Sequence, residues 1–457
     1  MTGFSVAINP ATGEEIARYS HHTPERIAGM IDMAKAAYDE WRLVDFGERS
    51  RLMSRLGGVL EANRDTYAEV MTAEVGKPIT ESLAEIDKCA WVCRYYAENA
   101  ASMLADRHID TERRSFVHHE PLGVVLAVMP WNFPFWQVFR FLAPALMAGN
   151  TGILKHASNV PGCALAIEEA VIKAGFPRGV FQAVLIPGRR VAEIVDHPAV
   201  AAATLTGSEG AGASLAERCG ARLKKVVLEL GGSDPYLVLE DADIELAAAT
   251  CAKSRVINSG QSCIAAKRFI VHEAVYEEFV ERFTANMAAL VVGDPTDEAT
   301  QVGPQARHDL RDELHGQVEA SVVAGARVIL GGEIPDGPGA YYPPTVLVEV
   351  AQGMPAYDEE LFGPVAAVIR VLSEDEAIGV ANDTRFGLGA AVFTRDLKRG
   401  ERIAAKEIEA GTCVVNTFVA SDPRLPFGGI KMSGFGRELS DLGIREFVNQ
   451  KTVIVSK

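Results

Sequence analysis

The sequence predicts an α/β protein with two successive domains, each containing a parallel sheet. Short apolar runs alternate with amphipathic helical segments, first over residues 122–231 and again from about Asp234 onward. This alternation is typical of β–α–β units. The chain of 457 residues is also longer than one hydrophobic core normally supports. We therefore place a domain boundary close to Gly231.

Two parts of the chain have a different pattern. From Pro24 to about Arg107 apolar residues recur three and four apart, as in IAGMIDMAKAAYDEW, which predicts a helical opening. The segments SFVHHE (115–120) and REFVNQKTVIVSK (445–457) have the composition of extended strands and fit neither domain. These two segments can pair with each other as an arm.

Composition limits the classes of partner. The formal charge is −16 at pH 7, and 48% of the residues are hydrophobic. A soluble globular protein is indicated, and nucleic acid and anionic membrane surfaces are disfavoured because both require clustered Lys and Arg. No basic, apolar leader begins the chain and no run approaches the ~18 apolar residues that span a bilayer. We expect a cytoplasmic location.

Seven cysteines are present, without a C-x-x-C pair or zinc-type spacing to histidine. Reduced thiols and no metal site are therefore expected. Cys263 differs from the others because it lies in GQSC, between a predicted helix and a predicted strand, with Gly260 nearby. On this peptide alone, a nucleophile and an ordinary core thiol are equally good readings.

Two further segments contain polar groups suited to catalysis. Glu229 ends the apolar run of KKVVLELGG, where burial would raise its pKa toward the range of a general base; a helix cap is the alternative. Asn132, in PWNFPFWQVFR, can donate its amide to an oxyanion. On a helix that begins at Pro134, Asn132, Trp136 and Arg140 would share one face.

Three glycine-rich segments complete the pattern. TGSEGAG (206–212) joins a strand to a helix and can place backbone N–H groups against a pyrophosphate. EELFGP (359–364) and LPFGGIKMSGFGRE (425–438) combine glycine with aromatic residues, as expected of backbone packed near a ligand or an interface.

Taken together, these motifs resemble those of the aldehyde dehydrogenase superfamily over essentially the whole chain. Within it, PWNFPFWQVFR, LELGGSDP and GQSCIAAKRF are most similar to bacterial succinate-semialdehyde dehydrogenases. The similarity is specific because separate motifs agree in order and spacing: WNFP, KHAS, TGS, ELGG, GQSC, EELFGP and PFGG.

The resemblance implies NAD(P)-dependent oxidation of an aldehyde. Cys263 would be the nucleophile, the Asn132 amide and the Cys263 backbone N–H would hold the oxyanion, and Glu229 would activate the water that hydrolyses the thioester. The residues implied to bind the cofactor are Trp131, Lys155, Ser158, Gly207, Ser208, Glu360 and Phe362.

Cofactor choice depends on Ser158. Many relatives carry a glutamate three residues after the cofactor lysine, but here the chain reads Lys155, His156, Ala157, Ser158. Without that carboxylate a 2′-phosphate is not repelled, and His156, if protonated, would add positive charge. We expect NADP+ to be preferred and NAD+ to be accepted as well.

For the substrate, we expect Arg140 to bind a terminal carboxylate, with Trp136 as a wall and Ser421 as a hydroxyl donor. The more frequent fate of an arginine, a surface salt bridge, is the alternative. The implied substrate is succinic semialdehyde, with glutarate semialdehyde or another short aldehyde as the next candidate. A CoA-acylating enzyme or a non-catalytic protein on the same fold are further alternatives.

The implied fold has three parts. They are a Rossmann-like cofactor domain (1–106 and 122–231), an α/β catalytic domain (232–434) and a β arm for oligomerisation (107–121 and 435–457). Because family members are dimers or tetramers, a homodimer or homotetramer is expected, with a small semialdehyde as the only other partner.

Overall fold

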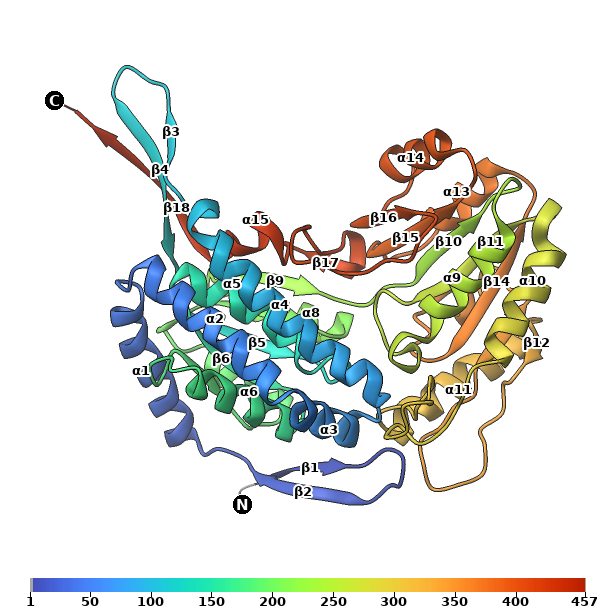
Figure 1. Ribbon diagram of the computed structural model, residues 1–457, viewed down its shortest axis with the longest axis horizontal. Coiled ribbons are helices and arrows are strands. Elements are labelled where there is room, and N and C mark those ends of the chain that lie inside the picture. The colour runs from blue at the N-terminus through green and yellow to red at the C-terminus, as the bar shows by residue number, and fades with distance from the viewer. Residues whose placement is uncertain (1–2, 457) are drawn as a thin grey trace.

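Four helices follow an N-terminal β hairpin and span Pro24 to Met103, as the apolar periodicity predicts (Figure 1). The Thr23 and Asp45 side chains accept from backbone N–H groups at the starts of the first two, and Gly76, in the left-handed conformation, ends the third. The computed structural model describes residues 3–456. Residues 1, 2 and 457, which the predicted domain ranges include, lie outside it. The helices are α1 (Pro24–Trp41), α2 (Phe46–Ala62), α3 (Arg64–Val75) and α4 (Ile79–Met103).

The first large sheet has the strand order β17-β9-β8-β5-β6-β7, and only the short β17 runs antiparallel to its neighbour. The strands are β5 (Val124–Met129), β6 (Thr151–His156), β7 (Phe181–Ala183), β8 (Val200–Thr206), β9 (Lys225–Glu229) and β17 (Gly434–Phe435). The helices between them are α5 (Trp136–Ala148), α6 (Pro161–Lys173), α7 (Val191–Val195) and α8 (Glu209–Gly220).

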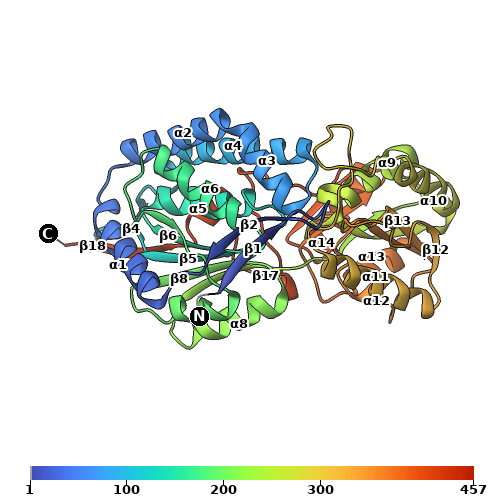
Figure 2. The same cartoon turned by 90° about the horizontal axis from the view of Figure 1, so that it is seen from below.

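Helices cover both faces of this sheet (Figure 2). Val125 and Ala127 pack with α2, α4, α5 and α6, while Val124 and Leu126 pack with α1, α7 and α8. Successive side chains of a strand point to opposite faces, so a strand buried on both sides reads as the continuous apolar run GVVLAVM.

The second sheet has the order β12-β13-β14-β11-β10-β15-β16, with only β12 antiparallel. Its strands are β10 (Asp234–Val238), β11 (Ala266–His272), β12 (Arg327–Leu330), β13 (Thr345–Val348), β14 (Val365–Val371), β15 (Gly389–Phe393) and β16 (Thr412–Val415). Its helices are α9 (Ile244–Val256), α10 (Glu273–Ala288), α11 (His308–Val323), α12 (Pro355–Asp358), α13 (Glu374–Asn382) and α14 (Leu397–Lys406). The chain changes sheets between β9 and β10; the domain limits themselves stay a prediction.

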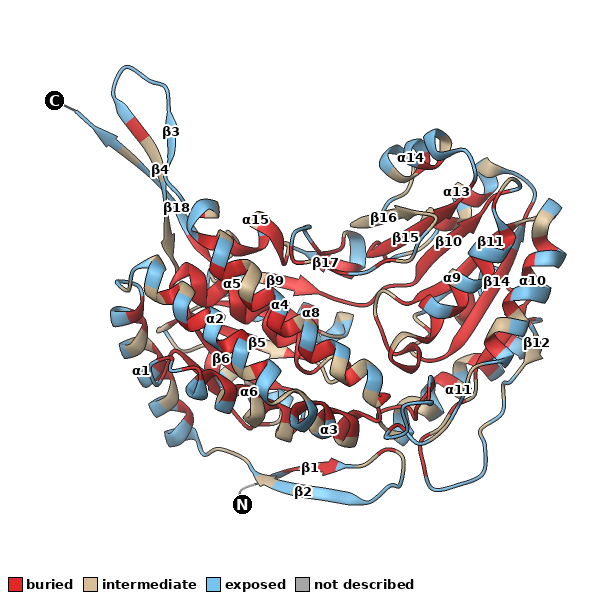
Figure 3. Cartoon of the chain, viewed as in Figure 1, coloured by how far each residue is buried: buried red, intermediate tan, exposed pale blue. Residues whose placement is uncertain are grey.

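Two small β structures lie outside these sheets. The hairpin of β1 (Phe4–Ile8) and β2 (Glu15–Ser20) reaches the second half of the molecule, where Ala340 N–H donates to the Pro10 carbonyl over 2.8 Å. The two extended segments of the sequence do pair: β18 (Val448–Val455) lies antiparallel to β4 (Arg114–Pro121), with β3 (Arg107–Ile109) beyond it. This arm projects from the molecule and is largely exposed (Figure 3). Within residues 3–456 no helix has the length and apolarity that a bilayer crossing requires.

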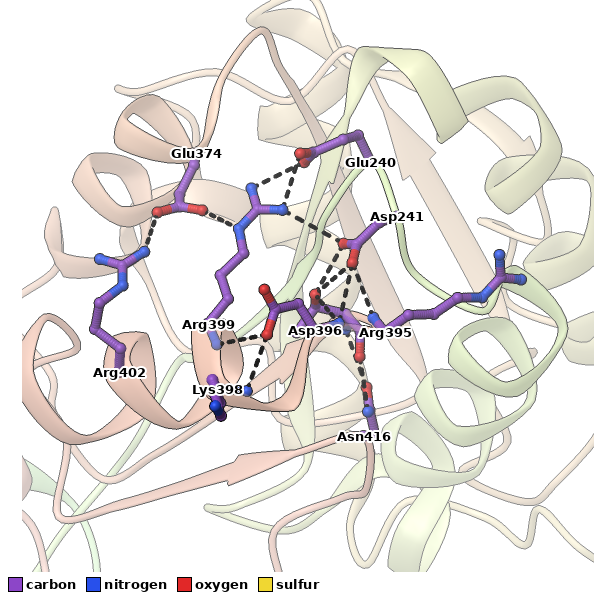
Figure 4. Close-up of polar contacts among 10 residues, drawn as sticks. Glu240, Asp241, Glu374, Arg395, Asp396, Lys398, Arg399, Arg402 and Asn416 are labelled. Atoms are coloured by element: carbon purple, nitrogen blue, oxygen red, sulfur yellow. Dashed lines mark hydrogen bonds and ion pairs between the residues drawn. The ribbon is translucent and has the colours of Figure 1, made fainter.

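An ion-pair network stabilises the outer end of the second sheet (Figure 4). Arg399 of α14 pairs with Glu240 and with Glu374 of α13, and Arg402 pairs with the same Glu374. Asp241 accepts from the Thr394 hydroxyl over 2.8 Å. Each charged side chain of this network has a partner within it, so we assign it a structural role.

A buried ion pair fixes the start of α5. The Glu85 carboxylate of α4 accepts from the backbone N–H groups of Phe135 (2.9 Å) and Trp136 (2.8 Å). It also pairs with Lys77, and both side chains are almost completely buried. The Lys77 ammonium lies 3.7 Å from the centroid of the Phe133 ring. Lys77 and Glu85 therefore hold the residues on either side of Pro134.

We expect Lys77→Met to lower the free energy of unfolding by about 3 kcal/mol, because the Glu85 carboxylate would stay buried without its cation. The double variant K77M/E85Q should lose less, since a neutral amide still accepts from both N–H groups. Urea unfolding followed by fluorescence measures both. A double variant as unstable as the single one would contradict this explanation.

Candidate active site

A cavity of about 210 Å³ lies where the carboxyl ends of β5, β8 and β9 meet loops of the second sheet. Parallel strands end at the same edge of a sheet, so the loops that follow them converge, as at other ligand sites of α/β proteins. The cavity brings together seven of the predicted residues: Trp131, Asn132, Gly207, Ser208, Cys263, Glu360 and Phe362.

The Cys263 loop is held tightly from several sides. At Gly260 φ is +78°, and a Cβ there would lie 2.2 Å from the Gly363 carbonyl carbon, so only glycine fits. The Lys267 ammonium donates to the carbonyls of Ser262 and Cys263, each over 2.8 Å. The glycine of GQSC thus packs the cysteine loop against EELFGP, which is the second segment of the cavity.

Cys263 is a neutral thiol in the ligand-free protein. Burial raises its pKa to about 12, and the charges of Arg140 and Lys267 only partly oppose this effect. Its side chain nevertheless reaches the cavity. A reaction at this sulfur must therefore include removal of the thiol proton, because the thiolate is the nucleophile.

Asn132 lies in the loop before α5, whose first residue is Trp136. The expectation that a helix from Pro134 places Asn132 on a helical face is thus wrong, because the Glu85 contacts begin the helix later. Its Nδ2 donates to the Gln261 carbonyl over 3.0 Å, and Asn258 donates to the Asn132 carbonyl over 2.7 Å. One amide N–H is thus used for orientation and the other is left for an oxyanion.

Glu229, at the end of β9, has both carboxyl oxygens buried without a hydrogen bond. Burial and the nearby Glu438 raise its pKa well above the usual range, while Arg140 acts in the opposite direction. Burial also raises the pKa of Glu438. These two carboxyl groups titrate as a pair, and the alternative reading of Glu229 as a helix cap finds no contact in the structure.

Arg140 does not make a surface salt bridge. Its side chain is buried, its Nε lies 2.7 Å from Oε2 of Glu438, and its guanidinium lies 4.5 Å from the centroid of the Phe427 ring. Its charge acts on both Cys263 and Glu229. The predicted selector is therefore next to the reactive groups, but Glu438 already neutralises part of its charge.

The other two predicted substrate residues contact each other. The Ser421 hydroxyl accepts from the Trp136 indole Nε1 over 3.1 Å. It also accepts from the Lys88 ammonium over 2.9 Å, and this ammonium lies 4.4 Å from the centroid of the Trp136 ring. Lys88 was not predicted, because nothing in the local sequence of α4 marks it.

The cofactor residues fall into two groups. Trp131 and Phe362 make an edge-to-face contact, with centroids 5.8 Å apart, at the wall of the cavity. Glu360 accepts from the Gly232 N–H over 3.1 Å and lies 3.2 Å from the Lys267 ammonium. Lys155 instead lines a second cavity of about 610 Å³.

The second cavity contains another cation that was not predicted, the exposed Arg189. Ser158 lies nearby in the sequence, in an exposed turn after β6. His156 would add positive charge only if protonated, and burial lowers its pKa to about 4, so this condition is not met near neutral pH. Its Nδ1 accepts from the Ala157 N–H, so its Nε2–H donates to the Pro134 carbonyl over 2.9 Å. His156 therefore connects β6 to the Asn132 loop.

Comparisons with known proteins agree over the whole chain. The model of the "Aldehyde dehydrogenase family" matches residues 4–453. A protein of Synechocystis sp. named as a probable succinate-semialdehyde dehydrogenase (NADP+) is 50% identical over 450 residues, which cover 98% of this chain and 99% of that one. Succinate-semialdehyde dehydrogenase (NADP+) 1 of Mycobacterium tuberculosis is 49% identical over 453 residues, with the same coverage.

Solved structures give the same result. The crystal structure of succinic semialdehyde dehydrogenase from Streptococcus pyogenes, in complex with NADP+, is 38% identical. It superposes with a TM-score of 0.97 and covers 99% of this chain and 100% of that chain. The predicted α/β aldehyde dehydrogenase fold is confirmed. The chain belongs to the aldehyde dehydrogenase family.

Proposed function

We propose that this protein oxidises succinic semialdehyde to succinate, with NADP+ as the preferred hydride acceptor and NAD+ as a second one. The observation that carries the proposal is that Cys263 and Asn132 line one cavity between the two large sheets, and that Glu229 ends β9 directly before Leu230 and Gly231, which line the same cavity. Two relatives that are 49 to 50% identical over nearly their whole length bear this activity and NADP+ in their names.

In the first half of the reaction, the Cys263 thiol gives its proton to solvent water and the sulfur attacks the aldehyde carbon. The carbonyl oxygen becomes an oxyanion, which the free Asn132 N–H and the Cys263 backbone N–H stabilise. NADP+, when bound, supplies the hydride acceptor that turns the thiohemiacetal into a thioester. Arg140 and Lys267 favour the thiolate, because both charges lower the pKa of Cys263.

In the second half, Glu229 acts on water. As a carboxylate it takes a proton from the water whose oxygen attacks the thioester carbon, and the Cys263 sulfur leaves with a proton as the acid is formed. A buried carboxyl with a raised pKa is a stronger base than an exposed one once it is ionised. Neither oxygen has a hydrogen bond within the described residues, so Glu229 breaks none when it accepts from the water.

The residues of the two cavities suit a dinucleotide. The apolar walls of Trp131 and Phe362 fit a nicotinamide ring, and Glu360 offers carboxylate oxygens to its ribose. Gly207 and Ser208 precede α8, whose N-terminus favours phosphate groups. Lys155 and the exposed Arg189 place positive charge at the second cavity, where we assign the adenosine ribose and its 2′-phosphate.

We also propose that the arm joins copies of this chain into a homo-oligomer. Strands β18 and β3 form its two edges, with backbone groups free to pair. Three apolar side chains of the arm are exposed: Ile109, Ile454 and Val455. An arm with this composition suits burial against another copy.

Cys263→Ala should lower kcat by more than about 10⁴-fold, since the covalent route is lost. Cys413→Ala is the matched control, because that thiol is also only partly buried, and it should keep activity.

Glu229→Gln should release a burst of reduced cofactor followed by a slow steady rate, as measured by stopped-flow absorbance. A burst-free Glu229→Gln, or turnover by Cys263→Ala, would refute the assigned roles.

In the pH profile of kcat, Glu438→Gln should move the decline on the acid side to lower pH by about one unit. Glu229 works when deprotonated, and the like charge of Glu438 raises its pKa. Removing that charge lowers the pKa of Glu229, and Arg140, freed from its partner, lowers it further. Glu446→Gln, which removes a weaker repulsive charge, should give a smaller shift in the same direction. A decline at unchanged or higher pH in Glu438→Gln would contradict the coupling.

Ser158→Glu should lower the ratio of kcat/KM for NADP+ to that for NAD+ by about two orders of magnitude. Two like charges ~5 Å apart repel by roughly 3 kcal/mol at an effective dielectric constant near 20. Ser158→Gln has the same size without the charge and is the control. If both variants change the ratio equally, size and not charge governs the choice of cofactor.

A further inference from the structure

A third cavity, of about 350 Å³, adjoins the cavity of the thiol, and both are lined by Ser208 and Phe362. The first turn of α8 borders the third cavity through Glu209 and Gly210. The residues that follow in the same helix line the cavity of Lys155. A dinucleotide with its nicotinamide in the first cavity and its adenosine in the second therefore passes the start of α8 with its pyrophosphate.

The charges around the third cavity are unequal. Arg385 is the one basic side chain among the described residues that line it. Four carboxylates line it as well: Glu209, Glu313, Glu359 and Glu360. Glu360 is compensated by the Lys267 ammonium, 3.2 Å away. A phosphate group in this cavity needs a cation or N–H donors, so Arg385 is the cation of the second half of the molecule that can hold it.

Arg385 is already paired with a carboxylate of the first half. Its Nη2 lies 3.4 Å from Oε1 of Glu209, the first residue of α8, while Arg385 itself lies between α13 and β15 of the second sheet. The Arg385 side chain is 54% exposed, and its guanidinium lies 5.0 Å from the centroid of the Phe386 ring. Exposed ion pairs contribute little to stability, so another anion can replace Glu209.

The exchange needs movement of one side chain and not of the backbone. The Arg385 carbonyl accepts from the Met432 N–H over 2.9 Å, which fixes the loop. At the start of α8 the Ser208 hydroxyl accepts from the Ala211 N–H over 3.4 Å, and the other first N–H groups of a helix have no partner within it. A phosphate at those N–H groups lies at the same helix end as Glu209. It therefore competes with that carboxylate for the guanidinium.

We infer that the Glu209–Arg385 ion pair is exchanged when the dinucleotide binds: the Arg385 guanidinium leaves the Glu209 carboxylate and binds the cofactor pyrophosphate. The cofactor is then held by both halves of the molecule. Glu209 is the competitor that lowers the affinity and speeds the release of the cofactor. This inference rests on the proposed function, because it names residues that bind and release its cofactor.

Arg385→Met should raise the dissociation constant of NADP+ about 10-fold, because a charge-assisted hydrogen bond to the pyrophosphate is lost. Isothermal titration calorimetry without aldehyde measures this constant. Arg385→Lys keeps the charge and should recover most of the affinity. Arg395→Met is the matched control and should leave the constant unchanged, since this exposed arginine lies beside the ion-pair network at the outer end of the second sheet (Figure 4).

Glu209→Gln should act in the opposite direction. It removes the competing charge without changing the size of the side chain, so NADP+ should bind about 3-fold more tightly. NADPH should also dissociate more slowly, which stopped-flow fluorescence follows. An ion pair that only holds the two halves together predicts weaker binding in both variants, so weaker binding by Glu209→Gln would overturn the inference.

The double variant Arg385→Met/Glu209→Gln separates exchange from an ion pair that persists in the complex. If Arg385 leaves Glu209, the loss caused by Arg385→Met is larger in the Glu209→Gln background, because the guanidinium no longer gives up a partner. If Arg385 acts only through Glu209, then Arg385→Met has no effect in that background. The second result would overturn the inference.

The loss of affinity in Arg385→Met should be the same for NADP+ and NAD+, because both contain the pyrophosphate. A loss confined to NADP+ would assign Arg385 to the 2′-phosphate and overturn the inference. A wild-type dissociation constant in Arg385→Met, with oxidation of succinic semialdehyde intact, would overturn the inference alone and leave the proposed function standing. A wild type that binds neither dinucleotide would overturn both.

Discussion

Two glutamates of helix α4 hold the reactive loops of both halves in one place. Glu85 binds the N–H groups that begin α5 and so fixes the loop of Asn132. Glu81 accepts from the Asn258 N–H over 2.7 Å, and the Asn258 side chain donates to the carbonyls of Asn132 and Gln261. Because these groups are buried, their hydrogen bonds are costly to break. The distance between the oxyanion donor and the thiol therefore depends on this helix.

Within that framework, burial disfavours the charged forms of the two reactive side chains. Burial raises the pKa of the Cys263 thiol to about 12 and raises the pKa of Glu229 well above its usual range. A neutral thiol reacts slowly with oxidants, so the nucleophile is protected until substrate and cofactor are present. The cost is that the Cys263 thiol must lose a proton in each turnover. The cations Arg140 and Lys267 reduce that cost.

A protein with a formal charge of −16 also has to attract an anionic aldehyde and an anionic cofactor. It does so with cations at particular positions and not with its overall field. Lys155 and Arg189 lie at the second cavity, while the charges of Arg140 and Lys267 act on the Cys263 thiol. Since the Debye length in the cell is about 8 Å, these local charges outweigh the distant acidic surface.

The sequence by itself determined the fold class and the peptides of the site, because both depend on local features. Apolar periodicity specifies which segments are helices and strands, and Gly260 is required by a backbone conformation within its own loop. Only the tertiary structure decided the charge states and partners. Lys88 and Ser421 are 333 positions apart in the sequence and yet form a hydrogen bond. Arg140 forms an ion pair with Glu438, which is also distant in the sequence. His156 is neutral near pH 6.5, where an exposed histidine would be half charged. A pKa depends on burial and on neighbours from other elements, and neither is present in a linear motif.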